Sequence, residues 1–369
     1  MIKTYIQKQI QDLKASGLYR ELKNLDLNNI INFSSNDYLG LSQNPTVIAK
    51  TIEALQKFGT GAGASRLISG NTPIHIELEK KLAKFKKREA ALVFSTGYMA
   101  NQGIISALLD DKDTVIIDRL NHASIIDACH LTKAKLQVYP HKDMIALEKI
   151  LSRSDKYTKR LIVTDSVFSM DGDIAPLPQI ITLAKKYNAI TMIDEAHATG
   201  TIGQTGKGAE EYFNIEGQID IVMGTLSKAL GSMGGFVTGK QELIELLINK
   251  SRSFIYSTAL APACCASAIA ALEIIENEPQ HLANLKQNIK LLSSIAPDSQ
   301  TPIIPIIIGE ADKTMAIAKQ LLDKGLFVSG IRPPTVPKGQ SRLRVTVSAT
   351  HKKEDLECLL CSLQELIPA

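Results

Sequence analysis

Short apolar runs alternate with helix-length segments along most of the chain, from about residue 46 onward. The runs are short, apolar and rich in residues that favour strands. They cover residues 90–94, 114–118, 136–139, 161–165, 189–194, 219–223 and 235–238. Strands that alternate with helices in this way predict an α/β fold, with a mainly parallel central sheet covered by helices on both faces.

The N-terminal segment has a different pattern. Residues 3–24 are mostly polar with helical spacing, and Gly17 is a possible break in that helix. After a turn, Ile30 begins a short apolar run that predicts a strand. We treat residues 1–45 as an N-terminal helix and strand segment that precedes the main alternating pattern.

The C-terminal part changes pattern again. From about Glu273 the spacing predicts a long helix, followed by a mixture of strands and a further helix. The expected strands lie at residues 303–308, near Phe327, and at residues 342–347. We therefore expect a large domain over residues 46–272 and a small α+β domain over residues 273–369.

Composition restricts the possible functions. The chain has 369 residues, 44% of them apolar and 22% charged, which is ordinary for a soluble globular protein. Its net charge of +4 is small and argues against a dedicated nucleic-acid binder. One short basic run follows a helical pattern, so we interpret it as a solvated helix face. It consists of Lys84, Lys86, Lys87 and Arg88.

Five cysteines in a chain of this length do not suggest a disulfide framework. Cys264 and Cys265 lie in an alanine-rich helical stretch and are expected in the core. Cys358 and Cys361 have C-x-x-C spacing, but no second cysteine pair or histidine pair accompanies them. A small buried thiol on an amphipathic last helix is therefore favoured over a zinc site, and no metal is expected.

The start of the chain lacks the apolar core of a signal peptide. The longest apolar stretch, residues 259–272, contains Pro262 and is too short for a membrane span. We therefore expect a cytoplasmic protein that has neither a membrane nor a nucleic acid as partner.

Two chemically reactive residues follow neighbouring apolar runs. Asp194 ends the run at 189–194, and Lys228 comes shortly after the run at 219–223. In open α/β sheets, ligands bind at the carboxyl ends of the strands, where both residues are expected. Pyridoxal phosphate needs such a pair, because a lysine amine forms its Schiff base and a carboxylate keeps its pyridine nitrogen protonated.

A site for the phosphate is predicted after the strand at 90–94. Gly97 and Tyr98 open the next helix there, and free backbone N–H groups at a helix start bind anions. Alone this signal is weak, because many strand-to-helix turns contain glycine. Thr225, three residues before Lys228, could add its hydroxyl to the same phosphate.

Three further polar residues follow predicted strands. His122 could stack on a cofactor ring, although a lone histidine is more often a packing or surface residue. His197, three residues after Asp194, could reach the ring hydroxyl. Ser169 lies on a loop past another strand, where a simple turn residue is as good an interpretation.

Two further motifs in the sequence would indicate nucleotide binding. Residues 194–197 spell the DEAH sequence of helicase-type ATPases, but that function needs a G-x-x-x-x-G-K-[ST] loop upstream, and the chain has none. The glycine-rich residues 59–66 resemble a dinucleotide loop, but a helical pattern precedes them where a strand is required. Neither motif is adopted.

Taken together, the motifs resemble those of the α-oxoamine synthases, a family of fold-type I pyridoxal-phosphate enzymes, along nearly the whole chain. The order and spacing of the segments carry this resemblance, since each is weak alone. The segments are 36–40, 61–70, 122–124, 168–172, 194–197, 225–231 and 342–344. Residues 17–20 and 331–337 further resemble the biotin-pathway branch of the family.

The resemblance implies a role for each site residue. Lys228 would be the Schiff-base lysine and Asp194 the pyridinium partner, with His122 stacked on the ring. The other expected cofactor contacts are Gly97, Tyr98, Ser169, His197 and Thr225. The expected substrate contacts are Arg20, Asn36, Arg332, Thr335 and Arg344.

The biotin-pathway branch implies a decarboxylative condensation of L-alanine with a pimeloyl thioester, carried by coenzyme A or by an acyl-carrier protein. A homodimer is also implied. The chain departs mildly from the family at Asp165-Ser166, where some members have Glu-Gly, and at Ala198, where Gly is frequent.

Three alternatives stay open at this point. A sister synthase, such as a glycine C-acetyltransferase, shares every core residue and differs only in the acyl group and amino acid it uses. A nucleotide-dependent DEAH protein would bind ATP. A non-catalytic subunit of the family would be expected to lack the lysine, whereas Lys228 is present.

Overall fold

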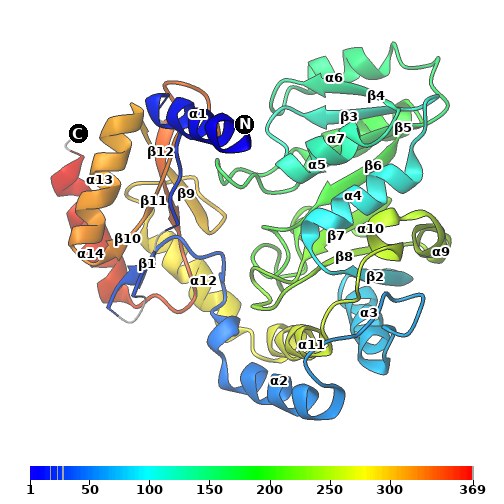
Figure 1. Cartoon of the computed structure of the whole chain (residues 1–369), viewed down its shortest axis with the longest axis horizontal. Coiled ribbons are helices and arrows are strands. Elements are labelled where there is room, and N and C mark those ends of the chain that lie inside the picture. Colours follow the sequence, from blue (N-terminus) through cyan, green and yellow to red (C-terminus); the bar gives the residue numbers. More distant parts are fainter. Residues whose placement is uncertain (17, 23, 27–28, 368–369) are drawn as a thin grey trace.

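The larger half of the computed structural model is built on one seven-stranded sheet (Figure 1); the structure describes residues 1–16, 18–22, 24–26 and 29–367. The strand order is β2-β8-β7-β6-β5-β3-β4. Each of the seven predicted runs forms one strand of this sheet. Their bounds are β2 (Ala90–Phe94), β3 (Thr114–Asp118), β4 (Lys135–Tyr139), β5 (Arg160–Asp165), β6 (Ile190–Asp194), β7 (Ile221–Thr225) and β8 (Gly235–Gly239).

Strands β4, β3, β5, β6 and β7 are parallel to one another, which confirms the mainly parallel sheet. Strand β8 runs antiparallel to both β7 and β2. Its direction follows from the short connection at residues 226–234, which contains no helix. Parallel neighbours need a long crossover, whereas antiparallel neighbours can be joined by a short turn. Lys228 lies in this connection.

Alternate residues along each strand pack into separate hydrophobic clusters on the two faces of the sheet. Leu92 and Val115 belong to one cluster, and Val93 and Ile116 to the other. Helices α4 (Gly97–Leu108), α5 (Ala123–His130), α9 (Gln241–Lys250) and α10 (Arg252–Ile255) contribute to the first. The second includes α2 (Pro45–Phe58), α3 (Pro73–Phe85), α6 (Met144–Leu151), α7 (Leu177–Lys186), α8 (Ala209–Phe213) and α11 (Pro262–Asn277).

The smaller half contains a three-stranded antiparallel sheet in the order β11-β12-β9. Its strands are β9 (Ile303–Gly309), β11 (Ser329–Ile331) and β12 (Ser341–Thr346), and its helices are α12 (Gln280–Leu291), α13 (Ala311–Asp323) and α14 (Lys353–Leu366). Strand β1 (Ile31–Asn32) pairs with β10 (Leu326–Phe327), which ties the N-terminal segment to this half. Figure 1 shows α1 (Ile2–Ala15) on the same side of the molecule.

The helix predicted over residues 3–24 is wrong beyond Ala15, where α1 ends. The hydroxyl of Ser16 donates to the carbonyl oxygens of Asp12 and Leu13. The backbone N–H groups of Leu18 and Tyr19 both donate to the carbonyl oxygen of Leu13. These bonds satisfy the last carbonyl groups and close the helix. The predicted break at Gly17 lies outside the described residues.

The single long helix expected from Glu273 is also wrong. The segment forms two helices, and the first, α11, already begins at Pro262. Proline fits the first turn of a helix, so Pro262 can start α11, while Pro279 cannot continue it. The expected boundary between residues 272 and 273 falls inside α11, and the division into domains stays a prediction.

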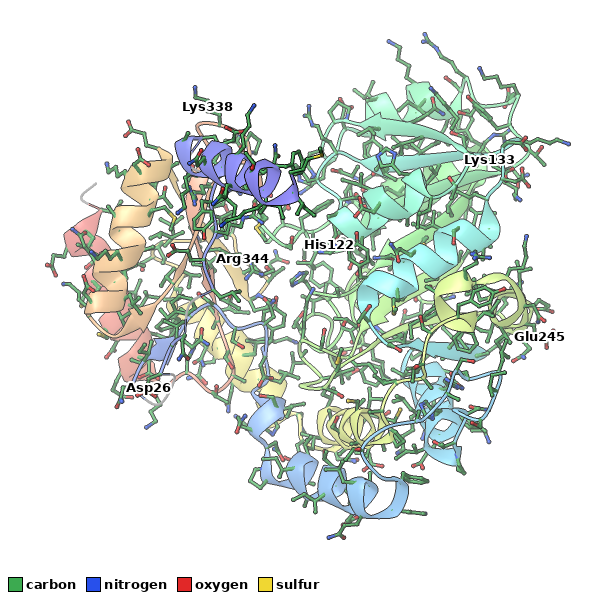
Figure 2. All side chains as sticks on the ribbon, viewed as in Figure 1. Asp26, His122, Lys133, Glu245, Lys338 and Arg344 are labelled. Carbon is green, nitrogen blue, oxygen red and sulfur yellow. The ribbon has the colours of Figure 1, made fainter. Side chains whose placement is uncertain are left out.

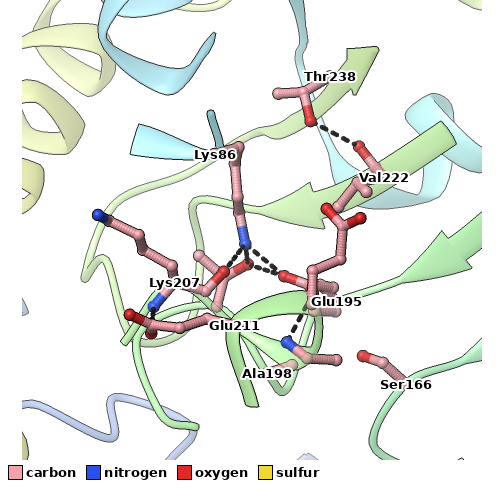
Figure 3. Close-up of polar contacts among 12 residues, drawn as sticks. Lys86, Ser166, Glu195, Ala198, Lys207, Glu211, Val222 and Thr238 are labelled. Carbon is pink, nitrogen blue, oxygen red and sulfur yellow. Dashed lines mark hydrogen bonds and ion pairs between the residues drawn. The ribbon is translucent and has the colours of Figure 1, made fainter. Parts of the chain in front are cut away.

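The basic run is exposed only in part. Lys86 and Arg88 are buried in ion pairs with Glu195 and Glu210. The ammonium group of Lys86 also donates to Thr199 Oγ1 and to the carbonyl oxygen of Lys207 (Figure 3), each at 2.7 Å. Helix α3 ends at Phe85, so the following residues turn inward instead of continuing along the helix surface.

The buried thiol expected on the last helix is also absent from the described structure, since Cys358 and Cys361 are both exposed. The buried positions of α14 include Leu356, Leu359 and Leu363, which lie on another face of the helix. Cys265 is buried as expected, and its neighbour Cys264 is partly buried. Among the described residues, no helix is both long and apolar enough to cross a membrane.

Candidate active site

A cavity of about 240 Å³ lies where β5, β6 and β7 end. Its position agrees with the general rule that open α/β sheets bind ligands at the carboxyl ends of their strands. The predicted site residues that line it are Gly97, Tyr98, His122, Asp194, His197, Thr225 and Lys228. The structure therefore brings these seven residues together from four separate segments.

Asp194 is held in place by donors to both of its carboxylate oxygens. The side-chain amide of Asn101 donates to Oδ2 and the backbone N–H of Ala196 donates to Oδ1, each at 2.8 Å. Asn101 in turn donates to the hydroxyl of Ser124. Asn101 was not among the predicted site residues, although its position one helical turn after Gly97 places it on the cavity side of α4.

Asp165 is a second buried carboxyl group beside Asp194. The two residues are direct partners in the β5–β6 register, and both line the cavity. Burial, and then the negative charge of Asp194, raises the pKa of Asp165 well above its usual value. The backbone N–H of His122 donates to Asp165 Oδ2 at 2.9 Å. Asp165 therefore holds the start of α5, and with it His122, at the cavity.

The amine of Lys228 lies 2.8 Å from Nε2 of His197. Burial lowers the pKa of Lys228 to about 8, and the charges of Asp194 and Asp165 only partly oppose this effect. Within the described part of the chain, Lys228 forms no salt bridge. A neutral amine is therefore accessible near physiological pH, as a nucleophile or base requires.

His197 is buried and uses both ring nitrogens. Besides the Lys228 contact, its Nδ1 lies 2.5 Å from the hydroxyl oxygen of Tyr38. Burial, and then the positive charge of Lys228, lowers the pKa of His197 well below its usual value, so the imidazole is neutral. Tyr38 is fully buried, which raises its pKa to about 12. The sequence analysis missed Tyr38, which precedes His197 by 159 residues.

The start of α4 forms part of the wall of the cavity. Thr96 caps this helix by accepting the N–H of Met99, and a helix start offers further N–H groups that have no partner inside the helix. A Cβ atom on Gly97 would lie 3.2 Å from Cε of Met223 and 3.5 Å from Oγ1 of Thr225. Glycine thus lets this helix start lie close against the end of β7.

Arg344 connects the smaller half to the site. Its guanidinium donates to Ser169 O at 2.6 Å and to Asn36 Oδ1 at 3.1 Å. Figure 2 shows Arg344 and His122 on facing sides of the space between the two halves. Ser169 thus contributes its backbone carbonyl to Arg344, and its side chain does not line the cavity formed by the strand ends.

The remaining predicted substrate residues line a different cavity of about 790 Å³. Arg20, Arg332 and Thr335 meet there, between the N-terminal segment and β11. Arg20 donates to Thr335 Oγ1 at 3.4 Å, and Arg332 donates to the carbonyl oxygen of Tyr19 at 3.1 Å. Two guanidinium groups on one cavity favour an anionic ligand.

Comparison with known proteins supports one family. The family described as aminotransferase class I and II matches residues 28–363. The 8-amino-7-oxononanoate synthase of Thermoanaerobacter pseudethanolicus is 46% identical, covering 98% of this chain and 96% of the relative. The 8-amino-7-oxononanoate synthase 2 of Bacillus subtilis is 44% identical, covering 97% and 96%.

Solved structures agree. A serine palmitoyltransferase from S. paucimobilis with bound PLP–myriocin superposes with a TM-score of 0.89 at 32% identity, covering 98% of this chain and 96% of that one. An 8-amino-7-oxononanoate synthase from Francisella tularensis superposes with a TM-score of 0.79 at 29% identity, covering 92% and 98%. The chain belongs to the aminotransferase class I and II family, as a member similar over nearly its whole length to the 8-amino-7-oxononanoate synthases.

Proposed function

We propose that the protein uses pyridoxal 5'-phosphate to condense L-alanine with a pimeloyl thioester. The products are 8-amino-7-oxononanoate, carbon dioxide and the free thiol, a step of biotin biosynthesis. One observation carries the proposal: a buried carboxylate, Asp194, and the amine of Lys228, which forms no salt bridge among the described residues, line one cavity with a helix start. The full-length similarity to named 8-amino-7-oxononanoate synthases supports the choice of reaction.

The donors and acceptors of this cavity fit the cofactor. Asp194 is an acceptor for a protonated pyridine nitrogen, and Asn101 and Ala196 hold it rigidly. Gly97 leaves the start of α4 accessible to a phosphate. Bound pyridoxal phosphate supplies an aldehyde that exchanges amines and a ring that accepts electrons. His122, at the start of α5, is proposed to stack on that ring.

Lys228 is the proposed catalytic base. Its amine would hold the cofactor in the resting protein and would serve as the base that removes the Cα proton of alanine. A positioned base of this kind accelerates a reaction by roughly 10²–10⁴-fold. With a pKa of about 8, the amine can both accept and return a proton near neutral pH.

The two substrate carboxylates are assigned to different arginines. Arg344, with Asn36 beside it, is proposed to bind the carboxylate of alanine. Hydrogen bonds through Asn36 and Tyr38 connect Arg344 to His197, which contacts Lys228. A pimeloyl thioester carries a second carboxylate at its far end. Arg20 and Arg332, with Thr335, are proposed to bind that carboxylate in the larger cavity.

The test is thiol release by the purified, cofactor-loaded protein. Alanine, glycine and serine are each combined with pimeloyl, acetyl, succinyl and palmitoyl thioesters of coenzyme A, and the pimeloyl group is also offered on an acyl-carrier protein. Release confined to alanine with a pimeloyl thioester is the expected result. Release with another pair, such as glycine with acetyl thioester, would assign the protein to a sister activity and overturn the proposed reaction.

Arg20→Met sharpens this test. Loss of one charged anchor raises KM for the pimeloyl thioester about tenfold or more, because a charge-assisted hydrogen bond contributes roughly 1.5–3 kcal/mol. The KM for alanine stays unchanged. Lys3→Met, on the exposed helix α1, is the matched control with a lost charge and no expected effect.

A cytoplasmic homodimer is proposed as the working form. Two large apolar side chains are exposed, Tyr98, which lines the cavity, and Met233, which lies in the loop after Lys228. A second copy of the chain would cover them. Light scattering that reports an active monomer would contradict the dimer. All five cysteines are free thiols, which supports a reducing cytoplasm.

A further inference from the structure

A continuous chain of hydrogen bonds runs from the amine of Lys228 to the guanidinium of Arg344. Lys228 Nζ lies 2.8 Å from His197 Nε2, and His197 Nδ1 lies 2.5 Å from the Tyr38 hydroxyl. That hydroxyl lies 3.1 Å from Asn36 Oδ1, which also accepts from Arg344 at 3.1 Å. The chain thus links the large half to β12 of the smaller half.

Arg344 fixes the direction of every bond in this chain. A guanidinium can only donate, so the Asn36 atom that faces it must be the amide oxygen. The same oxygen is the partner of Tyr38, whose only proton is therefore used in a bond to Asn36. The oxygen of Tyr38 must then accept from Nδ1–H of His197.

The neutral imidazole of His197 has one proton, and the contact with Tyr38 places it on Nδ1. Nε2 is then left with a lone pair that can only accept a hydrogen bond. Its one neighbour in this chain is the amine of Lys228, which must donate. A neutral amine that donates to Nε2 keeps its own lone pair directed elsewhere.

We propose that Tyr38 is a positioning residue for the reaction. Through its hydroxyl it holds His197 in the tautomer whose Nε2 accepts from Lys228, and Asn36 and Arg344 set the direction of that hydroxyl. The inference rests on the proposed function for the role of Lys228 and for the binding of a substrate carboxylate at Arg344. The direction of each hydrogen bond between Lys228 and Arg344 is a property of the protein without substrate.

The chain also gives Arg344 a second role. A carboxylate bound to Arg344 competes with Asn36 Oδ1 for its N–H groups and so changes the group that orients Tyr38. Occupation of the substrate site is thereby communicated to the amine through four side-chain contacts. Hydrogen-bond networks of this kind respond as units, because each bond polarises the next.

The tautomer can be measured directly. The protein is labelled with ¹⁵N-histidine, the cofactor is removed, and the ring nitrogens are observed by NMR. Seven histidines are present, and the signals of His197 are identified by their loss in His197→Gln. The expected result for the unmodified chain is a protonated Nδ1 and an unprotonated Nε2.

Two substitutions move the tautomer by different routes. In Tyr38→Phe the acceptor for Nδ1–H is lost, so His197 populates both tautomers. In Asn36→Ala the hydroxyl of Tyr38 is free to donate to Nδ1, so the proton moves to Nε2. Asn36→Asp retains an acceptor for both Tyr38 and Arg344, and it restores the original tautomer.

Activity supplies a second, separate readout. In Tyr38→Phe, kcat falls about tenfold, the factor that corresponds to one hydrogen bond of roughly 1.4 kcal/mol, while KM for the acyl thioester is unchanged. Tyr187→Phe is the matched control, because its hydroxyl bonds to Glu148, far from the site, at 3.1 Å. It leaves both kcat and the His197 signals unchanged.

An Nε2-protonated His197 in the unmodified chain would overturn the proposal, as would a tautomer unaffected by both Tyr38→Phe and Asn36→Ala. Misfolding of Tyr38→Phe, detected by circular dichroism, leaves the Asn36 pair of variants to decide. Because the NMR arm uses neither substrate nor cofactor, its outcome is independent of whether alanine and a pimeloyl thioester prove to be the substrates.

Discussion

Two lysines of this protein, the buried Lys86 and the partly buried Lys228, lie near the same strand end, and they have opposite surroundings. Lys86 contacts the carboxylate of Glu195, the hydroxyl of Thr199 and a backbone carbonyl, so all three of its N–H bonds have acceptors. Lys228 contacts the imidazole of His197 and forms no salt bridge among the described residues. Glu195, the partner of Lys86, directly follows Asp194 in the sequence.

The different surroundings give Lys86 a structural role and Lys228 a reactive amine. A buried ammonium that is surrounded by acceptors fixes the chain around it. Lys86 thereby ties the end of α3 to the segment that carries Asp194 and His197. A buried amine that has only a neutral partner instead loses its proton easily, and the pKa of Lys228 is lowered to about 8. Surroundings, and not residue type, decide which lysine can react.

The largest effect is expected from Lys228→Ala. Turnover falls by roughly 10²–10⁴-fold or more, because the proposed base and the covalent attachment of the cofactor are both lost. The folded structure persists, since no ion pair is broken. The measurements are thiol release and thermal unfolding. Near-normal turnover would contradict the proposed role of Lys228 as the catalytic base.

Lys86→Met gives the reverse pattern. It leaves Glu195 buried without its cation, which costs about 3–5 kcal/mol in the free energy of unfolding. Chemical denaturation measures this loss. Any decrease in activity follows from misplacement of Asp194 and His197, and it is smaller than for Lys228→Ala.

The double variant Lys86→Met, Glu195→Gln tests the cause of that loss. Without the carboxylate there is no uncompensated charge, so the double variant is more stable than Lys86→Met alone. A double variant that is less stable than the single one would show that packing, and not charge, explains the effect.

The sequence predicts the location of Lys228 but not the burial of Lys86. Lys228 and Asp194 could be placed together because the carboxyl ends of parallel strands meet at one edge of a sheet. Lys86 was expected on an exposed face, because helical periodicity does not indicate that α3 ends at Phe85. Partners such as Glu195, 109 residues away, leave no local signal in the sequence.

The same distinction holds for the fold and for the rest of the site. All seven strands of the main sheet were predicted, because each is a continuous apolar run. The antiparallel direction of β8 depends on the geometry of one short connection. Tyr38 comes from the segment that follows β1 and Asn101 comes from α4, and only the folded structure brings them to His197 and Asp194.

The two lysines should also differ in their reactivity with pH. In the cofactor-free protein, an acylating reagent modifies the neutral amine of Lys228, and the fraction in that form rises about tenfold between pH 7 and pH 9 for a pKa near 8. Mass spectrometry of the digested protein reports the extent of modification at each lysine. Lys86 remains unmodified until the protein unfolds, because it is buried in an ion pair. Equal labelling of both residues would contradict the comparison.

The smallest effect is expected from Thr199→Val, which removes one of the three acceptors of Lys86 but keeps the ion pair. The hydroxyl of Thr199 also lies 3.0 Å from Glu195 Oε2, so it bridges both charges. The free energy of unfolding falls by about 1.5–3 kcal/mol, the contribution of a hydrogen bond to a charged group, with activity nearly unchanged. Thr182→Val, at an exposed position of α7 where the hydroxyl donates to the carbonyl oxygen of Pro178, is the control. A loss as large as that of Lys86→Met would mean that the hydroxyl, and not the carboxylate, is what makes Lys86 structural.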